Sequence, residues 1–432
     1  MKNLITIIFI WGVNLSNAQQ AISAEEVVKR VLTSNSGLQS INGNTQVNML
    51  LNNPGAAGLT PTVSLNGSLS GAVLNSYQEF SNNTNQDRNG AASNGLSASI
   101  NADWLVYDGG KMFAVKRRLA AQTATAVLLA KEQAIALVSE ALLNYYELVR
   151  LQTALKYVLF NLDLAKERFK LVTVRLNTGA DSKVEWLLSK NEVSRAEGSV
   201  LQVKIQMANT SAKLSALMGE MSGREFIATD SLTTKTYTDI DALRKQMVAN
   251  NLTLLKVKSQ NLILSEQIKE ATALRLPQVQ MGGAYVFNRS QSQAGFLTMN
   301  RQTGLNVALI ARWNLYSGGR LQQNSRAMEL QLKNNEWLYK EATAQAEALL
   351  WLHFRNYELG RILLEGERQS VSDCEELVKI AWQRYSIGKS QLLENIETQR
   401  ILEEAQSRYI TALYNLKVSE INLMKVTGLM IQ

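Results

Sequence analysis

A long internal duplication constrains the fold of this chain more than any other feature. The segment WLVYDGGK at residues 104–111 recurs as WNLYSGGR at residues 313–320, an offset of 209 residues. Two glycine pairs follow at the same offset of 209: Gly179 with Gly388, and Gly219 with Gly428. Solenoid units are only about 20–50 residues long. The repeat therefore indicates a duplicated half-protein.

The N-terminus has the pattern of a secretory signal peptide. Lys2 supplies the positive charge, Leu4–Val13 is apolar, and Ser16–Ala18 offers small residues at the cleavage site. We expect residues 1–18 to be removed and the mature chain to start at Gln19. The apolar run is shorter than the roughly 20 residues that a transmembrane helix needs. Since no long apolar run follows, we expect that any membrane insertion uses strands.

Each half contains a long segment with coiled-coil spacing. Residues 109–177 lack proline, and apolar residues recur there every seven positions: Leu148, Leu155, Leu162, Phe169 and Leu176. The second half has an equivalent row: Tyr357, Leu364, Val371, Val378 and Tyr385. This seam predicts long helices that pair as a coiled coil. A helix over this range would be about 100 Å long, which no compact domain needs.

Glycines predict where these helices turn back. Gly179 and Gly388 suit the left-handed position after a helix. Asp181 and Ser390 suit the N-cap of the returning helix. Shorter helices are predicted at 22–51 and 240–275, and they would complete the length alongside the outgoing helices.

Four segments alternate apolar and small polar residues with period 2. The first pair has apolar positions at Val63, Leu65, Leu69, Val73, and then Leu96, Ala98, Ile100, Ala102, Trp104. The second pair has Val279, Met281, Tyr285, Phe287, and then Leu305, Val307, Leu309, Ala311, Trp313. Such alternation is typical of a membrane barrel with lipid outside and water inside. A soluble sandwich is the alternative. The Asn- and Ser-rich residues 75–93 and 289–302 are predicted as hairpin loops facing the exterior.

These patterns predict a membrane α+β fold with long antiparallel coiled-coil helices and four transmembrane strands per chain. The first structural repeat would span 19–219, with a strand pair at about 62–106 and a helical turn at 178–181. A linker at 220–239 leads to the second repeat at 240–428, with a strand pair at about 278–315 and a turn at 386–390. Residues 429–432 form a tail.

Four strands cannot enclose a water-filled lumen, and lipid does not tolerate an open strand edge. The barrel must therefore be shared among copies of the chain. Two copies would give eight strands, whose interior side chains fill, whereas three would give twelve, which can leave a channel. The sequence thus favours a homotrimer surrounded by lipid.

The residue inventory does not predict an enzyme. His353 is the only histidine, so a multi-histidine metal site is excluded, and we expect neither a metal nor a cofactor. Gly109-Gly110-Lys111 lacks the spacing of a phosphate-binding loop. The net charge of +8 comes from scattered Lys and Arg, so no nucleic-acid partner is expected.

The order, spacing and duplication of these motifs resemble the TolC-like outer-membrane efflux proteins, also called outer membrane factors. The resemblance rests on the duplicated long-helix hairpins and the strand pairs. It also rests on the Tyr107–Gly110 and Tyr316–Gly319 signatures and on the turn at Arg384–Gly388. It implies a homotrimer in the bacterial outer membrane, with a 12-stranded barrel and a periplasmic α-barrel. It also implies a passive exit duct that docks on a periplasmic adaptor and an inner-membrane pump, in efflux or type I secretion. The partner would decide the substrate.

The resemblance also implies functional positions. The tip contacts the adaptor in this family, and the matching residues here are Leu176, Asn177, Thr178, Gly179, Ala180, Tyr385, Ser386, Ile387, Gly388 and Lys389. The periplasmic gate would use Glu185, tied to Tyr385, and acidic rings at Glu394 and Glu397, whose crowding would raise their pKa values. Ser390 stands where the family often has a basic residue that braces the closed state.

Two other classes of function remain open at this point. A structural coiled-coil envelope protein or adhesin would share the helices but have no conducting lumen. A secreted enzyme would need activity in the isolated protein. Conductance in a planar bilayer separates the first of these from the duct.

Overall fold

The structure, a computed structural model, describes residues 20–220, 225–294 and 297–430. The predicted signal peptide lies outside these ranges. The described residues form two compact units. The hairpin unit comprises the described residues within Met1–Asn42, Leu129–Leu254 and Ala342–Gln432, and the strand unit comprises those within Gly43–Leu128 and Leu255–Glu341.

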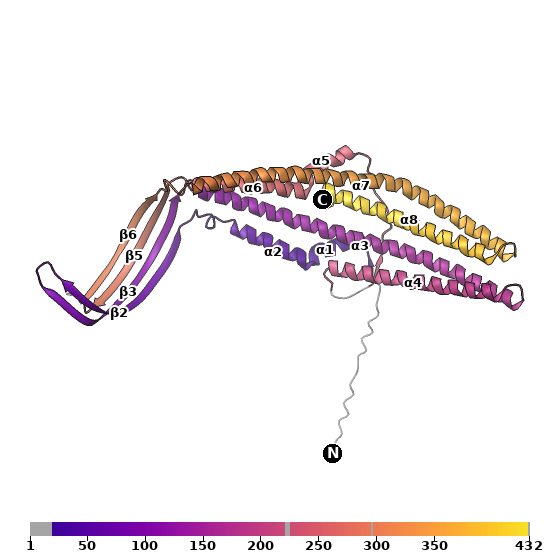
Figure 1. The fold of residues 1–432 in the computed structure, drawn as a ribbon, viewed down its shortest axis with the longest axis horizontal. Coiled ribbons are helices and arrows are strands. Elements are labelled where there is room, and N and C mark those ends of the chain that lie inside the picture. Colours follow the sequence, from indigo (N-terminus) through magenta and orange to yellow (C-terminus); the bar gives the residue numbers. More distant parts are fainter. Residues whose placement is uncertain (1–19, 221–224, 295–296, 431–432) are drawn as a thin grey trace, which may run out of the picture. The chain divides into compact units, whose positions relative to one another are not determined.

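The strand unit contains one antiparallel sheet of four strands in the order β2-β3-β5-β6 (Figure 1). The strands are β2 (Thr62–Glu79), β3 (Asn85–Tyr107), β5 (Gln278–Ser292) and β6 (Met299–Arg312). The central β3–β5 pair joins the two repeats, with Ile100 opposite Tyr285. Pro61 and Pro277 immediately precede β2 and β5, where a missing N–H costs no ladder hydrogen bond.

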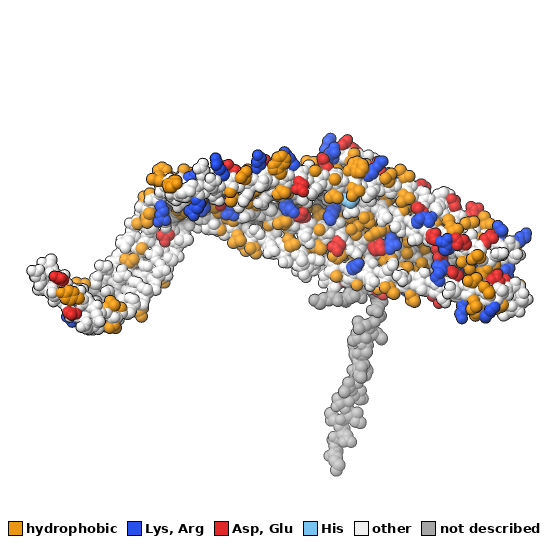
Figure 2. All heavy atoms as spheres, viewed as in Figure 1, with side chains coloured by type: hydrophobic (Ala, Val, Ile, Leu, Met, Phe, Trp, Pro, Cys, Tyr) orange, Lys and Arg blue, Asp and Glu red, His pale blue; other side chains and the backbone are white. Residues whose placement is uncertain are grey.

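The predicted alternation places apolar side chains on one face of the sheet. On the two outer strands these side chains are largely exposed: Val63, Leu65, Leu69 and Val73 on β2, and Leu305, Val307 and Leu309 on β6. Figure 2 shows few charged side chains along the strands. The sheet thus presents an apolar, almost uncharged surface at both of its edges.

The predicted hairpin loops at 75–93 and 289–302 are wrong in extent. Strand β2 continues to Glu79 and β3 begins at Asn85, with a register shift between Leu74 and Ser76. In the second hairpin, β5 continues to Ser292 and β6 begins at Met299. Asn and Ser have low strand propensity, but each tract has a partner strand opposite it, and pairing overrides propensity.

The helices of the strand unit pack through polar pairs. Helix α6 (Leu252–Ala273) lies along the first part of α3 (Lys111–Asn177), where Arg117 bonds Glu266 at 2.9 Å and Arg118 bonds Glu270 at 2.6 Å. Helix α2 (Ser36–Leu51) contacts the same helix, since Lys116 Nζ donates to the backbone carbonyl of Asn52 just beyond it.

None of the described helices combines the length and the apolar character that crossing a membrane requires.

The hairpin unit is built from α3, α7 (Arg320–Ser386) and their returning helices α4 (Lys183–Leu217) and α8 (Leu392–Thr427). Helices α3 and α7 each have 67 residues. The predicted heptad seam is confirmed at the positions that are buried: Leu148, Leu162, Tyr357, Val371, Val378 and Tyr385. Burial of this seam holds the long helices against their neighbours.

The short helices predicted at 22–51 and 240–275 are each broken in two. The first becomes α1 (Ala24–Ser34) and α2, and the second becomes α5 (Ile240–Asn250) and α6. An asparagine occupies each break and has extended backbone geometry (ψ 116°). Asn35 Oδ1 accepts from Leu38 N at 3.0 Å, and its Nδ2 donates to Leu217 O at 2.9 Å.

Asn251 makes the equivalent bonds, accepting from Leu254 N at 3.1 Å and donating to Val426 O at 2.9 Å. Each asparagine thus caps one helix and binds the end of another. A returning helix meets each break through a glycine with φ near +74°, Gly219 after α4 and Gly428 after α8. A Cβ on Gly219 would stand 2.5 Å from Ser34 O, and one on Gly428 would stand 2.6 Å from Asn250 O.

The predicted linker between the repeats packs on the hairpins where it is described. Strand β4 (Phe226–Ala228) pairs in parallel with β1 (Gln20–Ile22). The buried Tyr145 hydroxyl lies 2.9 Å from Asp230 Oδ2. Further along, Lys417 Nζ donates to Thr233 O at 2.7 Å and to Glu420 Oε2 at 2.9 Å. The linker is therefore bonded to helices of both repeats.

We expect Gly219→Ala to destabilise the hairpin unit by about 1–3 kcal/mol, because both its φ and its close contact exclude a Cβ. The measurement is the melting temperature of the purified protein. Gly198→Ala in the middle of α4 is the matched control, since no heavy atom lies within 4 Å of its Cβ position. That substitution should be neutral or stabilising by about 0.5–1 kcal/mol. Equal melting temperatures for the two variants would contradict the junction described here.

Candidate functional site

The ends of the two helical hairpins form the candidate site. Gly179 (φ +76°) and Gly388 (φ +75°) occupy the left-handed positions that the sequence predicts. The amide of the next residue bonds back to the helix: Ala180 N to Arg175 O, and Lys389 N to Arg384 O, both at 2.8 Å. These bonds close each helix C-terminus and leave the turn exposed.

Most of the predicted adaptor-contacting residues lie on the surface of these turns. Residues 177–180 and 386–389 are exposed, with Ile387 at 65 %. Leu176 is half-buried. Tyr385 is only 2 % exposed and packs with Val172 and Leu392. Its place in the heptad row turns the ring inward, so its side chain is not part of the exposed tip.

The returning helices begin one residue later than predicted. Ser182, not Asp181, is the N-cap of α4, and it forms a capping box with Glu185. In that box, Glu185 Oε2 accepts from Ser182 N at 2.9 Å. Gln391, not Ser390, precedes α8 and makes no side-chain cap. The capping box leaves Asp181 outside the helix and occupies the carboxylate of Glu185.

The expected tie between Glu185 and Tyr385 is wrong within this chain. The Tyr385 hydroxyl instead donates to Asp181 Oδ2 at 3.5 Å. Burial, and then the nearby Asp181, raise the pKa of Tyr385 above its ordinary value. Burial and repulsion from Glu185 likewise raise the pKa of Asp181. The acidic partner of Tyr385 is thus Asp181, which lies immediately before the N-cap of α4, and not Glu185 on the helix.

Arg175 connects the two tips through three contacts, and sequence reasoning missed it. Its Nη2 donates to Tyr385 O at 3.0 Å and to Ser386 O at 3.2 Å. Its guanidinium carbon lies 4.9 Å from the centroid of the Tyr385 ring. A cation at a helix C-terminus and over an aromatic face is doubly favourable. Its repeat counterpart is Arg384, and two arginines in matching last turns were the available signal.

The two carboxylates of the expected acidic rings lie exposed on one side of α8. Glu394 is 3.5 Å from Arg384, and Glu397 is 2.6 Å from Arg400. The hydrogen bond from Arg400 lowers the pKa of Glu397. Within one chain the charge nearest to Glu397 is thus an arginine three residues along the same helix, and the rise expected from crowding in a trimer stays a prediction.

No group of three or more His, Cys, Asp or Glu side chains in the described ranges is arranged to hold a metal ion. His353 is half-buried in the hairpin unit, where burial and Lys425 lower its pKa.

A model of the family named outer membrane efflux protein matches residues 55–220 and 243–429. These two segments cover most of the chain and follow the duplication. The chain therefore belongs to the outer membrane efflux protein family, as the motifs indicated.

Comparison with individual proteins agrees with this family. Outer membrane protein TolC of Escherichia coli K12 is 20 % identical over 361 residues, which cover 79 % of this chain and 71 % of TolC. The outer-membrane channel OprN superposes with a TM-score of 0.79 at 15 % identity, covering 94 % of this chain and 89 % of OprN. The CmeC outer membrane channel of Campylobacter jejuni also gives 0.79 at 15 % identity, covering 94 % and 85 %. At these identities the superpositions show a shared fold.

We expect Arg175→Ala to loosen the end of α7, because two charge-assisted hydrogen bonds to its last carbonyls are lost. Amide hydrogen exchange at residues 386–389 should quicken by about tenfold or more. Tyr385→Phe, which removes only the 3.5 Å contact to Asp181, is the control and should change exchange far less. A larger effect of Tyr385→Phe would show that the hydroxyl, not Arg175, holds the tip.

Proposed function

We propose that this chain forms a homotrimeric channel in the bacterial outer membrane, with its helices extending into the periplasm. It would act as the passive exit duct of a tripartite efflux or type I secretion system. A periplasmic adaptor would bind its helical tip, and an inner-membrane pump would supply the energy. The chain itself would carry out no catalysis.

The four-stranded sheet is the observation that carries this proposal. Among the described strands, β2 and β6 each have a partner on one side only, and both expose apolar side chains. An open strand edge in lipid leaves its backbone N–H and C=O groups without hydrogen-bond partners. The edges must therefore pair with strands of other copies. Three copies supply twelve strands, enough for a water-filled lumen, whereas eight strands are filled by side chains.

The long helices support an extension beyond the membrane. At 1.5 Å per residue, 67 residues correspond to about 100 Å, several times the bilayer thickness. Helices α4 and α7 also carry exposed large apolar side chains: Leu187, Leu201 and Ile205 on α4, and Trp351, Leu359 and Ile362 on α7. Such side chains favour helix packing against neighbouring copies in the trimer.

The tip supports docking through shape and backbone. Both turns are exposed, both lack a Cβ at their centre, and Ile387 and Lys389 stand beside the second glycine. A helical hairpin of an adaptor could approach the backbone closely at these points. The partner, not this chain, would then determine whether drugs, metals or proteins are exported.

We also propose Glu394 and Glu397 as the periplasmic gate rings. Glu185 would contribute through its capping box with Ser182, and Tyr385 through its packing with Val172 and Leu392. The two carboxylates lie three residues apart and therefore share a helix face. Three copies would place two rings of carboxylates around the axis. Their arginine partners are exposed, so the ion pairs are weak and leave the rings able to attract cations.

The gate proposal predicts that replacing both Glu394 and Glu397 with Gln lowers cation selectivity in a planar bilayer. Rings of carboxylates concentrate cations at a constriction, and neutral amides do not. The readout is the reversal potential in a salt gradient. Replacing Glu347 and Glu358 of α7 with Gln is the matched control, since both side chains are partly exposed and ion-paired. An unchanged reversal potential in the gate variant removes these residues from the pore.

The docking proposal predicts that Gly179→Leu or Gly388→Leu abolishes efflux in cells but leaves trimer levels and bilayer conductance intact. A bulky side chain at these turns would hold the adaptor away. Gly366→Leu, at an open position inside α7, is the control. Drug susceptibility and trimer content are measured together. If trimers disappear in the tip variants, the glycines are structural and the docking assignment fails.

Conductance also decides between the duct and a structural coiled-coil envelope protein. A chain that never conducts, even with Glu185 and Tyr385 replaced by Ala and Phe, would contradict the duct.

A further inference from the structure

A layer of buried polar side chains interrupts the apolar packing between α3 and α8. We call it the polar layer, and it consists of Asn161 and Arg168 of α3 with Asn395, Gln399 and Gln406 of α8. All five side chains are at least nine-tenths buried. Arg168 Nε donates to Asn395 Oδ1 at 2.6 Å, and its Nη2 donates to Gln399 Oε1. Asn161 Nδ2 donates to Gln406 Oε1 at 3.1 Å.

The layer bonds one hairpin to the other, and Gln399 Nε2 also donates to Glu403 Oε1 within α8 at 3.2 Å. Asn161 and Arg168 are seven residues apart, as are Gln399 and Gln406, so the contacts repeat after one heptad in an antiparallel sense. Gln399 Nε2 also donates to Asn161 O at 3.0 Å, which joins the two levels. One continuous chain of hydrogen bonds therefore holds hairpin α3/α4 to hairpin α7/α8.

Arg168 is only 3 % exposed, and among the described residues both of its hydrogen-bond acceptors are neutral amides. Glu192 and Glu403 are close enough to favour its charge, but both are bonded to Arg195, at 2.9 and 3.0 Å. Burial lowers the pKa of Arg168 to about 10. A buried cation bound only by amides is held less strongly than one paired with a carboxylate.

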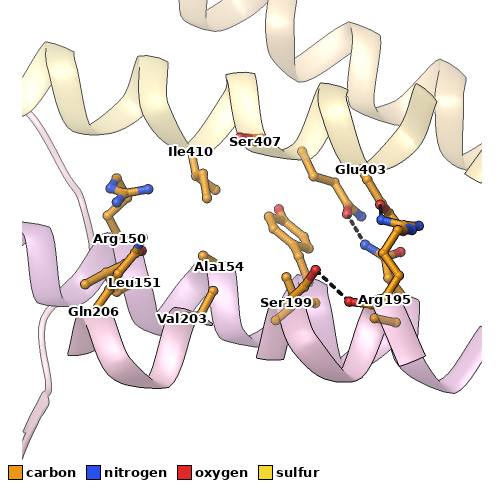
Figure 3. A pocket seen from close by; sticks show the side chains of 15 residues that line it. Arg150, Leu151, Ala154, Arg195, Ser199, Val203, Gln206, Glu403, Ser407 and Ile410 are labelled. Carbon is orange, nitrogen blue, oxygen red and sulfur yellow. Dashed lines mark hydrogen bonds and ion pairs between the residues drawn. The ribbon is translucent and has the colours of Figure 1, made fainter. Parts of the chain in front are cut away.

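A cavity of about 230 Å³ adjoins the layer, bounded by α3, α4 and α8 (Figure 3). In Figure 3, Glu403 and Ile410 reach from α8 toward side chains of α3 and α4. Asn161 and Gln406 also line it. The Asn161 Oδ1 atom is buried and has no hydrogen-bond partner among the described residues. The layer thus contains a buried polar atom without a hydrogen bond and lies beside a cavity. A core that never opens would be fully hydrogen-bonded and closely packed.

The layer lies on the same stretch of α8 as the proposed gate carboxylates. Asn395 follows Glu394 directly, and Gln399 is two residues beyond Glu397. The buried amides and the exposed carboxylates occupy opposite sides of one helix. Any movement of α8 away from α3 must break the layer and carry Glu394 and Glu397 with it.

We propose that Arg168 and its amide acceptors form a separable latch that positions α8 against α3 and so sets how readily the two hairpins part. This inference rests on the proposed gating function. The neutral acceptors make the latch strong enough to hold one arrangement and weak enough to release. A carboxylate in place of an acceptor would lock it, and loss of the guanidinium would release it.

The test compares Asn395→Asp with Arg168→Ala. The first supplies a nearly isosteric carboxylate to Arg168 and should lower the population with parted hairpins about tenfold. The second removes the donor and should raise that population about tenfold, because hydrogen bonds to a charged group stabilise the closed arrangement more than neutral ones do. Spin labels at Thr178→Cys and Ser386→Cys, in a Cys374→Ser background, report the separation. Labelled chains are diluted with unlabelled chains so that distances within one protomer dominate.

Asn422→Asp makes the same chemical change elsewhere on α8, and Arg408→Ala breaks the ion pair to Glu367 within one hairpin. Neither control should change the distance distribution. Adding Arg168→Ala to Asn395→Asp should cancel the tightening, which also covers the case in which Arg168→Ala alone fails to fold. Shifts in the same direction for both variants, or equal shifts in the controls, would overturn the latch.

Bilayer conductance of the same variants separates this inference from the proposed function. Label distances that shift as expected, in a protein that never conducts, would support the latch and refute the channel. Normal conductance with unchanged distances would refute the latch alone.

Discussion

Burial of the heptad seam is the interaction on which the rest of this structure depends. Isolated helices gain little from their own hydrogen bonds, so two helices of 67 residues persist only because one face of each is packed along its length. Tyr145, Leu148 and Tyr357 are almost completely buried where the inter-repeat linker crosses. With the helices fixed, the turns, the capping asparagines and the positions of the gate side chains follow.

Much of this fold could be predicted because its signals are periodic. Alternation located the strands, and heptads located the long helices. The breaks at Asn35 and Asn251 could not be predicted, because each asparagine takes its second partner from the end of a distant helix. The extent of the hairpins was missed for a similar reason, since polar tracts became strands only through the partner opposite them.

The sequence predicted where the site lies but not which side chains bond to one another there. The glycines fixed where the tips lie, yet side-chain partners depended on competition among neighbours. The Glu185 carboxylate accepts a hydrogen bond from Ser182, and the Tyr385 hydroxyl bonds to Asp181 instead. Arg175 and Arg384 occupy equivalent positions in the two repeats but serve different partners, the carbonyls of α7 and the carboxylate of Glu394. The two repeats have equivalent turns, and the different side chains around them give the two arginines different partners.

The paired junctions at Asn35 and Asn251 also show which lengths in this chain are free to vary. The distance from asparagine to proline is 26 residues in both repeats, Asn35 to Pro61 and Asn251 to Pro277. From proline to the tryptophan before the long helix it is 43 residues in the first repeat and 36 in the second. The entire difference of seven residues lies in the strand hairpin. The helical segments must keep matching lengths so that they meet end to end at the asparagine junctions. A strand hairpin can lengthen at its far end without changing these junctions.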